Sequence, residues 1–155
     1  MINKFLPEQL DNTYRGHKVA LWFFVVVVFM KTLQGLSVIY DSYSMASSAD
    51  GIPIETFPIA AAQTVATLFA ISGFSRLIIS LLGVLVLIRY RSAVAFMFSL
   101  LALDYVGRQL ILHFYPLVRV GNPIGPNVNH ILFALTIVGL VLSLWKRGTP
   151  QGQVI

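Results

Sequence analysis

Four long apolar segments dominate the sequence and limit the folds that are open to this chain. The segments span residues 19–40, 59–88, 92–115 and 130–145. A helix needs roughly 20 apolar residues to cross a bilayer, and these segments approach or exceed that length. Only short polar stretches separate them. The sequence therefore predicts an all-α integral membrane protein, a four-helix transmembrane bundle in which neighbouring helices are antiparallel.

The composition supports a membrane environment over a soluble one. Apolar residues make up 57% of the chain and charged residues 11%, whereas a soluble domain has about 25% charged residues. We expect one membrane domain at 19–145, between a short N-terminal segment at 1–18 and a tail at 146–155. The formal net charge of +5 comes mainly from short basic stretches beside the apolar segments, which indicates a role in membrane topology and not in nucleic-acid binding.

The distribution of basic residues predicts the orientation of the chain. One side of the membrane receives Lys4, Arg15, Lys18, Arg89, Arg91, Lys146 and Arg147. The other side receives only Arg119. By the positive-inside rule, both termini lie in the cytoplasm, and we expect a bacterial inner membrane. The longer stretches, 41–57 and 116–129, are then outer loops, and Asn127 or Asn129 is expected to cap the last helix.

Four charged residues interrupt the apolar segments, and they form the candidate site. Counting a rise of 1.5 Å per residue places Lys31, Arg76 and Asp104 about 18–20 Å into a hydrocarbon core of about 30 Å. Arg108 lies one turn further out, at about 24 Å. An ionised residue near the bilayer centre costs on the order of 2.5–3.5 kcal/mol, so these residues need partners. We call Lys31, Arg76, Asp104 and Arg108 the charged cluster.

Helical periodicity predicts which way the charged cluster faces. The face of Arg76 also carries Ser72, Gly73, Ser80 and Gly83. On the next segment, Asp104 shares a face with Gly107 and Arg108. Stripes of small and polar residues are expected to face other helices. The face of Lys31 is mixed, because Gln34 and Gly35 are followed by the apolar Val38.

The charged cluster is open to three interpretations. Asp104 can neutralise only one of the three cations, and Glu55 and Asp41 are the only further anions expected nearby. In the first interpretation, Asp104 pairs with Arg76 or Lys31 and locks two helices together. In the second, the surplus of positive charge forms an outward-facing pocket for an anion. In the third, Asp104 titrates on a proton or ion pathway.

We expect a binding or transport-accessory protein that holds an anionic small molecule or lipid headgroup. Secondary contacts are expected from Gln34, Tyr105, Glu55 and His130. A structural subunit of a larger membrane complex, completed by a protein partner, is one alternative. A membrane enzyme acting on a lipid or quinone is another. Ala62, Ala66 and Ala70 form a small-residue series that is also consistent with a homo-oligomer.

Several classes of chemistry find no support in the sequence. Cysteine is absent, which excludes disulfides, thiolate nucleophiles and thiolate metal sites. The motifs of zinc proteases, nucleotide-binding loops and serine hydrolases are also absent. His113 and His130 flank an outer loop as haem ligands could, but His113 faces away from Asp104, and both are read as interfacial histidines. We expect no catalytic residue, no metal and no cofactor.

Overall fold

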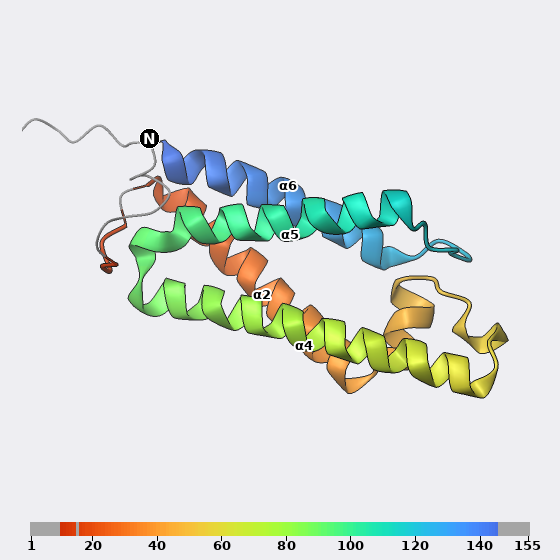
Figure 1. The fold of residues 1–155 in the computed structure, drawn as a ribbon. Coiled ribbons are helices and arrows are strands. Elements are labelled where there is room, and N and C mark those ends of the chain that lie inside the picture. The colour runs from red at the N-terminus through yellow and green to blue at the C-terminus, as the bar shows by residue number, and fades with distance from the viewer. Residues whose placement is uncertain (1–9, 15, 146–155) are drawn as a thin grey trace, which may run out of the picture.

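The computed structural model describes residues 10–14 and 16–145, which form five α-helices and no β-strand (Figure 1). The four long helices are α2 (Lys18–Tyr40), α4 (Ile59–Arg89), α5 (Val94–Phe114) and α6 (Ile124–Leu144). By length and composition, all four could cross a membrane. The loops 41–58 and 115–123 lie together at one end of the molecule, and the turn between α4 and α5 lies at the other (Figure 1).

The first three helices begin and end close to their predicted bounds, but the fourth begins six residues early. We predicted its start at residue 130, whereas α6 begins at Ile124. Pro126 lies in the first turn of α6, where backbone N–H groups have no partner within the helix, so proline is tolerated there. Asn127 and Asn129 therefore lie inside the helix, and neither caps it as predicted.

The first outer loop consists of short helical turns. They are α3 (Ser42–Ser44), the π-helical turn η1 (Met45–Ala49) and the 3₁₀ turn η2 (Ile54–Thr56). Asp41 caps the first of them, because its Oδ1 accepts a hydrogen bond of 3.1 Å from the Ser44 backbone N–H. Buried apolar side chains, including Ile54, form a small core beneath the loop. This core and these turns give the loop regular structure.

The two outer loops are joined to each other. The backbone N–H of Val120 donates a hydrogen bond of 2.7 Å to the carbonyl oxygen of Gly51. Gly51 has a φ of 72°, a conformation that side chains disfavour, and a Cβ there would lie 3.0 Å from the Val120 oxygen. A Cβ on Gly125 of α6 would lie 2.8 Å from Oδ1 of Asp50. These close approaches hold Asp50 against α6.

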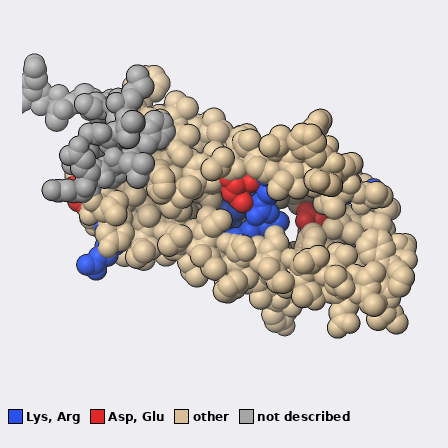
Figure 2. All heavy atoms as spheres, in the orientation of Figure 1, with Lys and Arg blue, Asp and Glu red and all other residues tan. Residues whose placement is uncertain are grey.

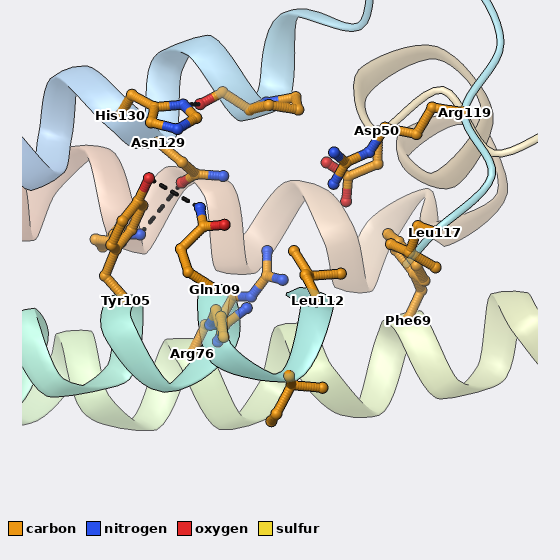
Figure 3. Close-up of a pocket in the computed structure, with 14 residues that line it drawn as sticks. Asp50, Phe69, Arg76, Tyr105, Gln109, Leu112, Leu117, Arg119, Asn129 and His130 are labelled. Carbon is orange, nitrogen blue, oxygen red and sulfur yellow. Dashed lines mark hydrogen bonds between the residues drawn. The ribbon is translucent and has the colours of Figure 1, made fainter. Parts of the chain in front are cut away.

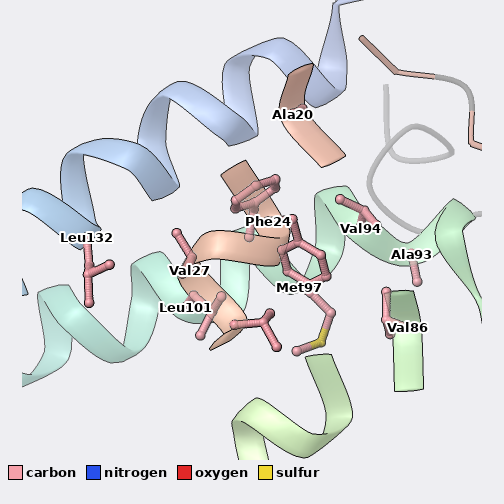
Figure 4. Close-up of a cluster of buried hydrophobic side chains, with 11 residues drawn as sticks. Ala20, Phe24, Val27, Val86, Ala93, Val94, Met97, Leu101 and Leu132 are labelled. Carbon is pink, nitrogen blue, oxygen red and sulfur yellow. The ribbon is translucent and has the colours of Figure 1, made fainter. Parts of the chain in front are cut away.

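The main apolar core lies near the end of the molecule where α4 turns into α5 (Figure 4). The rings of Phe24 on α2 and Phe98 on α5 meet edge to face, with centroids 5.0 Å apart. Gly139 of α6 packs directly against the Phe98 ring. The core residues are Ala20, Phe24, Val27, Val28, Val86, Ala93, Val94, Met97, Phe98, Leu101 and Leu132. Apolar packing therefore holds this half of the bundle together, and the charged cluster lies in the other half.

Glycines bring α2 and α4 into close contact. A Cβ on Gly35 would lie 3.1 Å from the backbone nitrogen of Leu77. Likewise, a Cβ on Gly73 or Gly83 would lie 2.8 Å from a valine methyl group of α2. The prediction that the stripe through Gly73 and Gly83 faces another helix is confirmed. This contact places Lys31 of α2 beside the helix that carries Arg76.

The outward faces of the long helices are apolar. Trp22 is 71% exposed, Phe29 60% and Leu103 67%, and many other large apolar side chains are exposed along all four helices. A soluble monomer rarely exposes apolar surface of this extent. The surface is therefore suited to contact with lipid.

Candidate functional site

A cavity of about 260 Å³ lies between the long helices, near the outer loops (Figure 3). Its charged lining comes from three helices and both loops. The charged residues are Lys31, Asp50, Arg76, Arg108 and Arg119. Three members of the charged cluster thus line one cavity, together with two loop residues that the sequence analysis did not assign to it. We call this space the basic cavity.

Polar side chains of α5 and α6 complete the lining of the basic cavity. Lys31 Nζ donates a hydrogen bond of 3.3 Å to Oδ1 of Asn129, and Gln109 Nε2 donates one of 2.9 Å to the Tyr105 hydroxyl (Figure 3). Nδ1 of His130 lies 2.6 Å from the Pro126 carbonyl oxygen. Because a carbonyl oxygen only accepts hydrogen bonds, Nδ1 is the donor in this contact. Tyr105 and His130 thus lie where the secondary contacts were expected.

Arg76 carries an uncompensated polar atom in the basic cavity. Its Nε is buried and has no hydrogen-bond partner among the described residues. Among the residues that the structure describes, no carboxylate lies within ion-pair distance of its guanidinium. By contrast, Lys31 is held by Asn129 and Arg108 is held by Asp104. A buried polar nitrogen without a partner is costly, so an external acceptor for Nε of Arg76 is expected.

The predicted partner of Asp104 is wrong. Asp104 pairs with Arg108 of its own helix, not with Arg76 or Lys31, and Nε of Arg108 lies 3.1 Å from its Oδ1. Residues four apart on a helix are already neighbours, so this pair forms without help from another helix. Asp104 therefore does not lock two helices together. It lies in the wall of a groove between α4 and α5.

The carboxylate of the basic cavity comes from an unexpected residue. Glu55 and Asp41 were predicted as the nearby anions, but Asp50 lines the cavity. Glu55 lies on η2 with its side chain exposed, and Asp41 caps α3. From the sequence, Asp50 was assigned only to the outer loop 41–57. The hydrogen bond between Gly51 and Val120, which folds the loop over the helices, joins residues too distant in the chain to be inferred.

A second cavity of about 180 Å³ lies beside the basic cavity. The two share Asp50, Phe69, Arg76 and Asn129. The smaller one is also lined by Gln34, whose Oε1 is buried without a hydrogen-bond partner among the described residues. Arg76 thus lines both cavities. Its own Nε and the Oε1 of Gln34 are the unsatisfied polar atoms among these lining residues. Buried polar atoms normally have partners, so both spaces are suited to water or a polar ligand.

The charges around the basic cavity do not balance. Four cations line it. Two carboxylates oppose them: Asp50, which also lines the cavity, and Asp104, which pairs with Arg108. The described residues at the site therefore carry a surplus of two positive charges. Figure 2 shows basic and acidic atoms in a hollow in the middle of a face whose other charged atoms lie near its two ends. An anion that reaches this hollow meets a positive site with low-dielectric walls.

A third cavity, of about 600 Å³, lies near the start of α2 and the end of α4. Tyr14, Lys18 and Arg91 contribute to its lining. Burial raises the pKa of Tyr14 to about 12, so the hydroxyl stays neutral at physiological pH. In the basic cavity, by contrast, charged side chains come from three helices and both outer loops. This convergence of charged side chains favours the basic cavity as the functional site.

Comparison with known proteins gave no match for this chain. No protein-family model matches it, and neither a curated protein nor a solved structure shows significant similarity. Within the described residues, no group of three or more His, Cys, Asp or Glu side chains is placed to hold a metal ion.

The pairing of Asp104 can be tested with double-mutant cycles in detergent. We expect Asp104→Ala to lower the free energy of unfolding by about 1–2 kcal/mol. This is less than for a fully buried pair, because the two side chains are 32% and 25% exposed. The coupling free energy of Asp104→Ala with Arg108→Leu should be about 1 kcal/mol and should exceed that with Arg76→Leu. A larger coupling with Arg76 would contradict the observed pairing.

Proposed function

We propose that this chain is a multipass membrane protein that binds an anionic small molecule or headgroup in the basic cavity. In this proposal its four long helices cross the membrane with neighbouring helices antiparallel and both termini in the cytoplasm. The basic cavity then opens toward the outer side. The observation that carries the proposal is the buried Nε of Arg76, which lies in a cavity with surplus positive charge and has no partner among the described residues.

Three features support the membrane orientation. The four long helices are apolar along their exposed faces. The basic residues gather on the side of the predicted cytoplasmic segments. Residues of the loops 41–58 and 115–123 line the basic cavity, and the same rule assigns these loops to the outside. An inner membrane of a bacterium remains the expected location.

The chemistry of Arg76 favours an oxyanion as ligand. A guanidinium offers several N–H donors in a planar fork, which matches the oxygen atoms of carboxylate and phosphate groups. An arginine in the middle of a membrane helix costs on the order of 2.5–3.5 kcal/mol. A bound oxyanion offsets that cost, because it supplies both the missing charge and the missing hydrogen-bond acceptor. The low dielectric of the site strengthens this interaction.

The position of the basic cavity favours a small ligand over a protein partner. The cavity is lined by side chains from all four long helices and both outer loops of one chain. A carboxylate from another subunit would have to pass between these elements to reach Arg76. A small anion or a headgroup needs much less space. Binding is therefore better supported than a role as a subunit whose charge a partner completes.

Thermal unfolding of the purified protein in a neutral detergent tests this function. Inorganic phosphate should raise the midpoint of unfolding in a saturable manner, because a ligand that binds only the folded state stabilises it. Sodium chloride at matched ionic strength is the control for screening. Equal shifts with phosphate and chloride would contradict a specific anion site.

A further inference from the structure

A groove of about 420 Å³ runs along the outer surface between α4 and α5. It exists because α4 packs mainly on α2, whereas α5 packs mainly on α6, so the two helices separate beyond the short turn that joins them (Figure 1). Ile79 and Leu82 of α4 form one wall, and Leu100 and Leu103 of α5 form the other. Apart from one ion pair, its lining is apolar. We call it the lateral groove.

Gly107 keeps the lateral groove open. It lies in the wall of the groove on α5, and a Cβ placed on it would have no heavy atom within 4 Å. Gly107 is therefore not needed for close contact between helices, unlike Gly35 or Gly73. A side chain at this position would extend into the groove. The position thus offers a way to fill the groove without disturbing the fold.

The lateral groove adjoins the basic cavity. Arg108 and Ile111 line both spaces, and Asp104 and Arg108 form their ion pair where the two meet. The hollow in Figure 2 shows charged atoms surrounded by an uncharged rim. An amphiphile can therefore place its polar end in the basic cavity while its chain lies along the apolar groove. A water-soluble anion would leave the groove unused.

We propose that the ligand is a membrane lipid with a terminal phosphate group, whose acyl chain lies in the lateral groove and whose phosphate binds Arg76 in the basic cavity. This inference rests on the proposed function, because it assigns the ligand of the same site. Charge complementarity supports it. A phosphate monoester carries nearly two negative charges at neutral pH, which matches the surplus of two positive charges at the site. A zwitterionic lipid would bring its own cation into an already cationic cavity.

The test compares two ligands and two matched variants. Phosphatidic acid carries the phosphate and the chains, whereas glycerol 3-phosphate carries the phosphate alone. Gly107→Phe fills the lateral groove. Val106→Phe places the same side chain on the same helix at a position that is 51% exposed and outside the groove. Dissociation constants are measured in detergent micelles for wild type and both variants, and thermal unfolding confirms that each variant is folded.

We expect wild type and Val106→Phe to bind phosphatidic acid at least tenfold more tightly than glycerol 3-phosphate. Gly107→Phe should lose this advantage and keep the wild-type affinity for glycerol 3-phosphate. Gly107→Leu should give the same result if the phenyl ring prevents folding. Equal affinity of wild type and the groove-filling variant for phosphatidic acid would overturn the lipid proposal alone. If wild type does not bind glycerol 3-phosphate at all, the proposed anion site itself fails.

Discussion

Arg76→Met should abolish phosphate binding and, in the same protein, raise the stability of the ligand-free state. Arg76 lies in the basic cavity with its Nε buried and unpartnered, so the folded protein bears an uncompensated cost. Methionine has a similar length and a high helix propensity, and it needs no partner. We expect the free energy of unfolding in detergent to rise by about 1–3 kcal/mol. Phosphate should then no longer shift the midpoint.

The expected rise in the free energy of unfolding of Arg76→Met distinguishes a ligand-binding role of Arg76 from a structural one. If Arg76 held helices together, Arg76→Met would destabilise the protein and leave anion binding to the other cations. Arg119→Met is the matched control, because Arg119 also lines the basic cavity but is exposed. It should weaken phosphate binding only a few-fold and leave stability within about 0.5 kcal/mol. A loss of stability in Arg76→Met would contradict the account.

Gly35→Leu should lower the free energy of unfolding by about 2–3 kcal/mol and weaken anion binding as well. A Cβ on Gly35 would lie 3.1–3.2 Å from the backbone N and Cα of Leu77. Backbone atoms cannot rotate away as a side chain can, so α2 would have to move from α4. Lys31 and Arg76 lie on these two helices, and their separation would change with the movement. Thermal unfolding and phosphate titration measure the two effects.

Gly107→Leu is the control for this glycine effect. It introduces the same side chain at a helical glycine whose added Cβ would meet no heavy atom within 4 Å. Glycine is about 1 kcal/mol less favourable than alanine inside a helix, so the change should leave stability equal or slightly higher. Equal destabilisation by both substitutions would show that close contact between α2 and α4 does not determine stability.

Local patterns predicted the features of this molecule that depend on one helix at a time. The apolar segments gave the four long helices, and the periodicity around Arg76 correctly placed Gly73 and Gly83 at a helix contact. The depths estimated from the helix rise were the same for Lys31 and Arg76, and both residues line the basic cavity. Helix rise and periodicity are properties of the backbone alone, so neighbours did not alter them.

Features that depend on contacts between distant segments were not predictable in this way. Asp50 reaches the basic cavity because the loop folds back, with a hydrogen bond between Gly51 and Val120. Several cations lie at a depth similar to that of Asp104, so depth alone does not identify its partner. Only the side-chain geometry shows that Asp104 pairs with Arg108. The early start of α6 was hidden by Pro126, which usually indicates a loop but fits the first turn of a helix.

Calorimetric titration of glycerol 3-phosphate into wild type and Arg76→Met tests most directly whether the basic cavity binds an anion. Both proteins would be held in the same neutral detergent at constant ionic strength. We expect a saturable heat with one site per chain in wild type and no saturable heat in Arg76→Met. No saturable heat in wild type, or the same binding curve in both proteins, would contradict this expectation.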